Sequence, residues 1–285
     1  MNLLKIIILF LIVFYLNCLG QLRPGAKQIA LSHSDVALAS DAYALFNNPA
    51  GLAQQNWREI SIYYSPSPFG INKLANGSAV YHEPTKLGSF AIAYSNYGFN
   101  LYKENSILVA YSKMIFNDFF LGVTVNYKNI SIQNYGSDNT LTLLLGGLTY
   151  LTNNLRIGFT LDNITRSTFG GDDNQIPIIF DVGLSYNLID ELSINIALQK
   201  EIDMNSSIRV GVDYQIIKYL NLRIGTMNEP SSFSAGIGIN YSIFEIDYAI
   251  FNHPDLGFTH QFGITLQFGA DKSRTERIKD FLEKN

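Results

Sequence analysis

The sequence has few charged residues, a single cysteine and no long apolar run. Only 15% of its 285 residues are charged, whereas a soluble domain typically has about 25%. The longest uninterrupted apolar run covers residues 6–16, far fewer than the ~20 residues that a membrane-spanning helix needs. A polytopic helical membrane protein is therefore excluded. A disulfide within the chain is excluded as well, because it requires two thiols.

Basic residues are not in excess either. The chain has 20 Lys and Arg against 24 Asp and Glu, which gives a net charge of −4. Since nucleic acids are bound by neutralising their phosphates, this balance argues against a nucleic-acid partner. What the chain does contain is 47% hydrophobic residues, 13% aromatic residues and 22 glycines. So much apolar content at low charge argues against disorder and predicts β-structure that faces something other than water.

The N-terminus has the features of an export signal. A basic Lys5 precedes the apolar segment 6–16, and small residues stand just before Gln21. Lipidation at Cys18 is the alternative, but the residues in front of it lack the small side chains that lipoprotein signals prefer. We therefore predict a cleaved signal peptide over residues 1–20.

From Trp57 to Phe268 apolar residues recur at every second position. This is the period of a strand whose two faces meet different environments. The alternation is clearest in residues 121–128, 192–199, 208–215 and 258–268. Two folds fit it: a soluble antiparallel sandwich, or a barrel with an apolar outside and a polar lumen.

The connections between the strands decide between these folds. Strands are predicted near residues 57–65, 77–83, 87–97, 104–115, 119–133, 139–151, 155–163, 178–187, 192–201, 207–217, 220–227, 233–241, 244–250 and 257–268. Tight turns alternate with longer loops such as residues 66–76 and 163–177. Outer-membrane barrels show this alternation, with short turns at one rim and long loops at the other. We predict an all-β fold, a transmembrane antiparallel β-barrel of about 14 strands over residues 57–268.

Aromatic residues cluster at the predicted strand ends. Beside the short turns lie Trp57, Phe116, Phe119, Phe120, Tyr150, Tyr186, Tyr219, Tyr241, Phe244 and Phe268. Toward the longer loops lie Tyr63, Tyr64, Tyr97, Tyr135, Phe169, Phe251 and Phe258. Because aromatic rings favour the membrane–water boundary, we predict two girdles. The alternative is that Phe and Tyr are simply good strand formers.

Charged residues of both signs fall on the predicted luminal faces of the strands. These luminal candidates are Lys128, Asp181, Arg209, Asp213 and Arg223. Such a mixture predicts a polar interior whose groups satisfy one another, rather than a charge-selective pore.

Residues 21–56 precede the barrel and do not alternate. Apolar residues between positions 37 and 46 suit a short helix, which Pro49 ends because proline cannot continue a helix. We predict a short N-terminal helical segment that sits inside the lumen.

The same segment carries a recognisable motif. It contains Gly25-Ala26, Ala30-Leu31, Asp41-Ala42-Tyr43-Ala44 and Asn48-Pro49-Ala50-Gly51-Leu52-Ala53. In these residues the sequence resembles the PorV/PorQ family, a branch of the FadL-like outer-membrane barrels. Ser32-His33 replaces a pair of glycines of the family pattern, and Lys27 replaces an arginine. This argues against a tight turn at residues 32–33, because glycine reaches positive φ without strain and Ser or His does not.

The resemblance implies a location in the outer membrane of a Gram-negative bacterium, in contact with outer-membrane lipid. It also implies one of two roles. One is passage of hydrophobic small molecules, with the N-terminal segment as a luminal hatch. The other is binding of components of the type IX secretion system. For Asn48, Pro49, Ala50 and Gly51 two interpretations stay open: a hinge of the hatch, or a turn that leads into the first strand.

Catalytic and cofactor motifs are lacking. The four histidines are scattered without metal-ligand spacing, and neither a Gly-x-Ser-x-Gly elbow nor a phosphate-binding loop is present. We therefore expect no enzyme activity, no cofactor and no bound metal. The alternatives are a lipid hydrolase that pairs a lipid-facing His260 with a serine, and a purely structural outer-membrane protein. Asp172-Asp173-Asn174 suits either a Ca²⁺ site or a solvated loop tip.

Residues 269–285 form a charged tail on the periplasmic side. Ile278, Phe281 and Leu282 are at helical spacing within it. Docking onto a periplasmic partner is one interpretation, and we favour the other, a solvated and partly helical extension.

Overall fold

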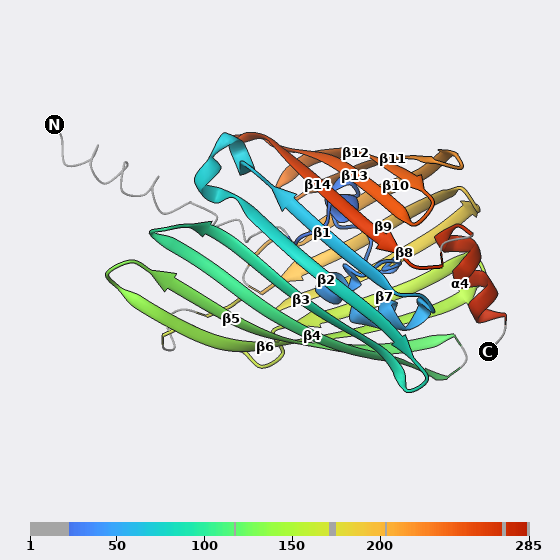
Figure 1. Ribbon diagram of the computed structural model, residues 1–285, viewed down its shortest axis with the longest axis horizontal. Helices are drawn as coiled ribbons and strands as arrows, with labels where there is room; N and C mark the ends of the chain where they lie inside the picture. The colour runs from blue at the N-terminus through green and yellow to red at the C-terminus, as the bar shows by residue number, and fades with distance from the viewer. Residues whose placement is uncertain (1–22, 117, 171–174, 203, 270–271, 284–285) are drawn as a thin grey trace.

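The described residues form a closed antiparallel barrel of fourteen strands (Figure 1). The computed structural model describes residues 23–116, 118–170, 175–202, 204–269 and 272–283. The strands are β1 Glu59–Ser65, β2 Asn76–Thr85, β3 Gly88–Phe99, β4 Tyr102–Phe116, β5 Phe119–Ile132, β6 Gly136–Thr152, β7 Leu155–Asp162, β8 Ile179–Ile189, β9 Leu192–Glu201, β10 Ser207–Ile217, β11 Leu220–Asn228, β12 Ser231–Tyr241, β13 Phe244–His253 and β14 Gly257–Gln267. Each strand pairs with the next, and β1 closes the barrel on β14. The predicted fold is confirmed, whereas the signal peptide and Asp172-Asp173-Asn174 lie outside the described residues.

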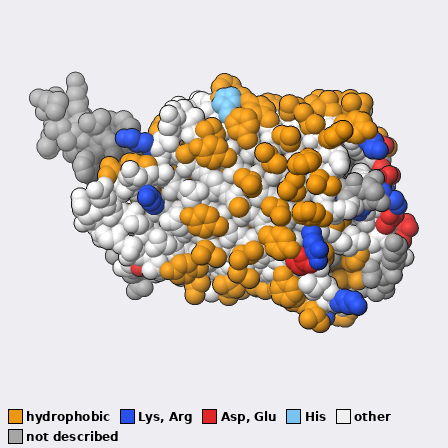
Figure 2. Space-filling model, viewed as in Figure 1, with side chains coloured by type: hydrophobic (Ala, Val, Ile, Leu, Met, Phe, Trp, Pro, Cys, Tyr) orange, Lys and Arg blue, Asp and Glu red, His pale blue; other side chains and the backbone are white. Residues whose placement is uncertain are grey.

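Apolar side chains of the strands point away from the lumen. Ile62 pairs with Ile264, which pairs with Ile246, and these side chains are 55%, 49% and 49% exposed. The next positions, Ser61 and Thr265, are buried and share a hydrogen bond of 2.9 Å inside the barrel. Hydrophobic side chains cover the middle of the outer wall in Figure 2. The sandwich is excluded, because two stacked sheets would bury these faces against each other.

The aromatic girdles are confirmed only in part. Aromatic residues that lie exposed at the barrel's ends include Phe116, Tyr219, Tyr241, Phe244, Tyr64, Tyr135 and Phe258. The prediction is wrong for the buried residues Trp57, Tyr63, Phe120 and Phe251, and for Tyr150, whose hydroxyl donates to Gln54 of the N-terminal segment. A position near a strand end does not decide which face a side chain takes, since the strand alternation sets that.

Residues 23–57, which we call the plug, fold inside the barrel (Figure 1, blue). Every residue from 25 to 52 is buried. The plug contains the helix α2 (Ala26–Ala30), the single turn α3 (Ala44–Asn47) and the 3₁₀ helix η1 (Pro49–Gln54). The predicted helix over 37–46 is therefore wrong in extent, because only its last turn forms. Pro49 ends α3 and starts η1, a position where its missing N–H costs nothing.

The C-terminal tail packs against the barrel end. Helix α4 (Arg274–Leu282) starts at a capping box of Ser273 and Glu276 and buries Arg277 and Ile278. The predicted partial helix is confirmed, but the prediction that the tail is solvated is wrong. The reason is that the apolar face of α4 meets the plug and the barrel rather than water. None of the helices in the described part of the chain is long and apolar enough to cross a membrane.

Candidate functional site

Glycines on the inner face of the strands leave room for the backbone of the plug to lie against the barrel wall. They are Gly122, Gly146, Gly158, Gly183, Gly211, Gly225 and Gly236. A Cβ at Gly146 would lie 2.2 Å from Oδ1 of Asn48, and one at Gly122 would lie 2.4 Å from the carbonyl carbon of Pro49. Because atoms cannot approach so closely, the backbone of the plug can lie on β5 to β12 only where these side chains are missing.

The Asn-Pro-Ala-Gly motif attaches the plug to this wall. Asn48 is fully buried, and its Nδ2 donates to the carbonyl oxygens of Val36 at 2.8 Å and Gly147 at 3.0 Å. Its Oδ1 accepts from the backbone N–H of Ala50 at 3.2 Å, which caps η1. The motif therefore joins two parts of the plug to strand β6. Whether it also acts as a hinge stays a proposal.

The turn at Ser32 and His33 is left-handed, with φ of 51° and 54°. The expectation that loss of the paired glycines removes this turn is therefore wrong. The N–H of His33 donates to the carbonyl of Gln28 at 2.8 Å and that of Ser32 to Ile29 at 2.9 Å, so the turn satisfies the C-terminal carbonyls of α2. The Ser32 hydroxyl also bonds that of Ser234 at 3.1 Å. These contacts offset the strain of positive φ.

His33 itself is a buried, neutral side chain. It is 5% exposed, and neither ring nitrogen has a partner among the described residues. Burial, reinforced by the charges of Arg209 and Arg23, lowers the pKa of His33 well below its ordinary value. The imidazole is therefore uncharged at neutral pH.

Two of the predicted luminal charges meet at Arg223. Its guanidinium is buried and pairs with Asp213 at 3.2 Å, with Glu245 at 3.3 Å and with Asp247. Glu245 and Asp247 were not among the predicted luminal residues, although they occupy alternate positions of β13. The alternation that placed Arg223 in the lumen would have placed these two there as well.

Two further predicted charges form a second cluster. Asp181 accepts from Arg23 of the plug at 3.1 Å and from Gln199 at 2.8 Å, and Oε1 of Gln199 accepts from Arg209. Lys128 lies apart from both clusters on β5, half-buried and opposite Thr140 of β6. Four of the five predicted residues, Asp181, Arg209, Asp213 and Arg223, form ion pairs or hydrogen bonds, and a luminal role of the five stays a proposal.

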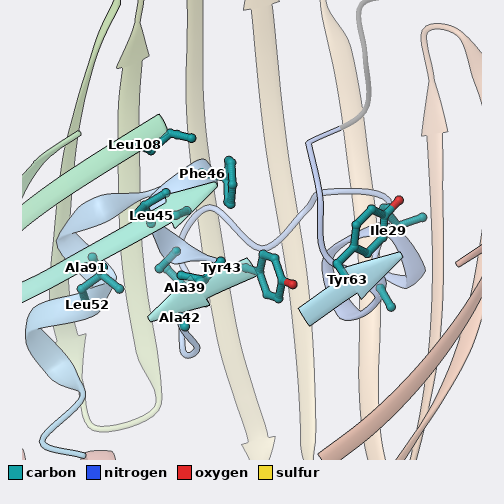
Figure 3. Close-up of a cluster of buried hydrophobic side chains, with 14 of the residues drawn as sticks. Ile29, Ala39, Ala42, Tyr43, Leu45, Phe46, Leu52, Tyr63, Ala91 and Leu108 are labelled. Carbon is teal, nitrogen blue, oxygen red and sulfur yellow. The ribbon is translucent and has the colours of Figure 1, made fainter. Parts of the chain in front are cut away.

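One side of the lumen is apolar. The side chains of the plug and of β1 to β4, β11 and β13 form a cluster (Figure 3). We call it the luminal apolar cluster; its main members are Ile29, Tyr43, Leu45, Phe46, Leu52, Tyr63, Val80, Leu108, Met227 and Phe251. Phe69, in the long loop after β1, packs against it, and its backbone N–H donates to Thr259 at 2.9 Å. Dispersion and the burial of apolar surface hold this cluster together.

A polar cavity of about 940 Å³ lies at the end of the barrel where α4 packs. We call it the vestibule; Leu38 and Ser40 of the plug, Arg223 of the wall and Arg274 of α4 are among its lining residues. Ala39 lies between Leu38 and Ser40 and belongs to the luminal apolar cluster. The plug therefore has one side in the apolar cluster and the other in the polar vestibule.

His260 is exposed on the outer wall, as predicted. Its Nδ1 is 2.6 Å from the hydroxyl of Tyr248, and the two rings stack at 6.0 Å. Ser65 is buried, and its hydroxyl donates to the backbone carbonyl of His260 rather than to the imidazole ring. The side-chain pair that a hydrolase needs is not formed at this nitrogen. Within the described residues no group of three or more His, Cys, Asp or Glu could hold a metal ion.

Comparisons with known proteins place the fold. Neither a protein-family model nor a curated protein matches the sequence. Among solved structures, the monoaromatic hydrocarbon channel CymD is 11% identical with a TM-score of 0.62, and the match covers 87% of this chain and 97% of CymD. The Pseudomonas putida toluene transporter TodX is 11% identical with a TM-score of 0.63, covering 87% and 97%. A Pseudomonas aeruginosa FadL homologue is 12% identical with a TM-score of 0.58, covering 86% and 97%. The chain shares its barrel fold with these three structures.

Proposed function

We propose that this protein lets small hydrophobic compounds cross the outer membrane through its plugged barrel. The observation that carries the proposal is the luminal apolar cluster. In a barrel with an aqueous pore, side chains such as Leu108 and Met227 would be expected on the lipid side, because lumens are usually polar. Here they are buried in one cluster with Phe46 and Tyr43 of the plug. An apolar guest gains free energy there by leaving water.

The fold supports the same function. CymD, TodX and the FadL homologue share the fold and are 10% to 12% identical to this chain. CymD is a monoaromatic hydrocarbon channel, and TodX is a toluene transporter. We expect compounds of similar size and polarity for this chain. The action is non-enzymatic, because passage needs no bond to be made or broken. The secretion role that the PorV/PorQ resemblance implies has no support from these neighbours and stays a prediction.

Entry of an apolar fluorophore into intact Gram-negative cells tests the proposal. The lipopolysaccharide layer slows N-phenylnaphthylamine, so its fluorescence in the cell envelope should rise faster in cells that make the protein. Met227→Lys places a charge in the luminal apolar cluster and should abolish this gain, because an apolar guest there would strip water from the ammonium group without offering it a partner. Thr226→Lys, next to it on the outer face, is the matched control and should keep the gain. Equal entry with and without the protein would refute the function.

A further inference from the structure

Helix α4 joins the plug and the barrel through one arginine. Nη1 of Arg274 donates to the carbonyl oxygen of Ser40 in the plug at 3.0 Å and also pairs with Glu59 at the start of β1. Nη2 of the same group pairs with Glu245 of β13 at 2.6 Å. Three segments that lie far apart in the sequence therefore meet at a single guanidinium.

Glu59 extends this junction on the side of the plug. Its carboxylate is fully buried, and Oε2 accepts from the backbone N–H of Ala42 at 2.8 Å. Oε1 accepts from the indole N–H of Trp57 at 2.6 Å. Loss of the Arg274 charge would leave two buried carboxylates, Glu59 and Glu245, without their counter-ion on α4. Breaking a buried ion pair in this way is strongly destabilising.

Other residues of α4 also pack against the plug and the strands beside it. The guanidinium of Arg277 lies 3.9 Å from the centre of the Trp57 ring, and it donates to Gln267 at the end of β14. Phe281 and Leu282 pack on a small cluster of Ala37, Ala50, Phe120 and Leu148, of which the first two belong to the plug. Charge, aromatic and apolar contacts of α4 thus all reach the plug or the strands beside it.

We propose that α4 is a latch that keeps the plug seated, and that release of α4 at Arg274 frees the plug segment between the luminal apolar cluster and the vestibule. The role of the latch in passage rests on the proposed function, whereas the contacts that form the latch are a property of the fold. Segment 38–40 is the part of the plug that Arg274 holds, and in it Leu38 and Ser40 line the vestibule while Ala39 belongs to the luminal apolar cluster. In the latched state the plug closes the path, and movement of α4 is the step that opens it.

Amide hydrogen exchange of the whole folded protein tests the latch without any transport assay. In Arg274→Ala, exchange of amides in residues 38–46 should speed up on the order of a hundredfold, because buried carboxylates lose their counter-ion. Lys279→Ala is the matched control: it removes a cation of the same helix whose pair with Asp190 is far more exposed, so exchange should change little. Equal exchange of residues 38–46 in the wild type and Arg274→Ala would overturn the latch.

Amides of β3 to β5 report whether the barrel itself stays folded. If they also exchange faster in Arg274→Ala, Arg274→Lys is the deciding variant, since it keeps the charge but loses the second donor arm. Faster amide exchange in that variant confined to residues 38–46 supports the latch. The same change in exchange along the whole chain refutes it. Fluorophore entry is measured separately. A latch that loosens without any wild-type entry would refute the proposed function and leave the latch standing.

Discussion

The side-chain amide of Asn48 donates to the carbonyl of Gly147 at 3.0 Å, across the boundary between the plug and strand β6. The same nitrogen holds Val36 of the plug, while the amide oxygen caps η1. One buried side chain therefore joins two parts of the plug and attaches them to the wall. This relationship gives the Asn-Pro-Ala-Gly motif a structural role that does not depend on transport.

Asn48→Asp should loosen the plug while the barrel stays folded. The substitution keeps the acceptor for Ala50 but turns the donor into a buried anionic oxygen that faces two carbonyls. Leaving buried groups unpaired costs about 1–3 kcal/mol, and more when a charge is involved. Limited proteolysis and amide exchange of residues 30–50 should both accelerate. Wild-type protection of the plug in this variant would contradict the role given to Asn48.

Gly146→Ala should displace the plug, because the new methyl group would overlap Oδ1 of Asn48. We expect a loss of about 1–3 kcal/mol in the stability of the plug, as for other overpacked sites. Gly263→Ala is the matched control on β14, where the nearest atom to an added Cβ is 3.4 Å away. Thermal denaturation and exchange of the plug amides should separate the two variants. Similar behaviour of both would show that the plug does not rest on the glycine positions.

The fold could be predicted from the sequence because an outer-membrane barrel repeats one simple pattern. A period of two residues places Ile62 outside and Ser61 inside without any knowledge of long-range contacts. Turn lengths then give the strand number. The same reasoning fails at strand ends, where Trp57 precedes the regular part of β1 and is covered by Arg277 of α4. That contact joins residues too distant in sequence for any local pattern to show.

The plug could be recognised but not built from the sequence. Its motif identified Asn48, yet the partner of Asn48 is a backbone carbonyl, which no side-chain pattern reveals. The turn at Ser32 and His33 forms although glycine is absent, because hydrogen bonds to the end of α2 hold it. The role of Arg274 could not be predicted from the sequence, because it depends on where α4 lies relative to Ser40. Tertiary contacts decide these features, and local propensity does not.

The plug should be held more firmly at acidic pH. Burial, with a smaller effect of the Asp41 charge, raises the pKa of Asp35 to about 6. An exposed Asp titrates near 4, so the seated plug binds a proton more tightly than the released one. Seating is strongest below about pH 4, weakens by up to about 3 kcal/mol as pH rises to about 6, and is constant above that.

Asp35→Asn should remove this pH dependence. The amide keeps an acceptor for Asn47, which donates to Asp35 at 3.2 Å, and it carries no charge at any of these pH values. Exchange of the plug amides, corrected for the intrinsic effect of pH, is the measurement. An equal change of the corrected exchange rate with pH in the wild type and the variant would assign the pH dependence to another group.

A charge on the middle of the outer wall should cost more than one at its rim. Phe262 lies exposed near the centre of β14, and Phe268 lies exposed just beyond the end of the same strand. Phe262→Lys should destabilise the barrel by about 2–4 kcal/mol in lipid vesicles, and Phe268→Lys by about 0–1 kcal/mol. Urea titration of folding into vesicles measures both. Equal costs would mean that the centre of the wall does not contact hydrocarbon.

The claim that apolar compounds occupy the lumen is tested most directly by locating one there. Crystals soaked with bromobenzene should show the anomalous signal of bromine against Phe46 and Tyr43 of the plug, beneath Phe69, with the Phe69 ring displaced to admit the guest. Bromine at this position would support passage of apolar compounds through the lumen. Bromine found only on the lipid-facing wall, with the luminal apolar cluster unchanged at saturating concentration, would contradict it.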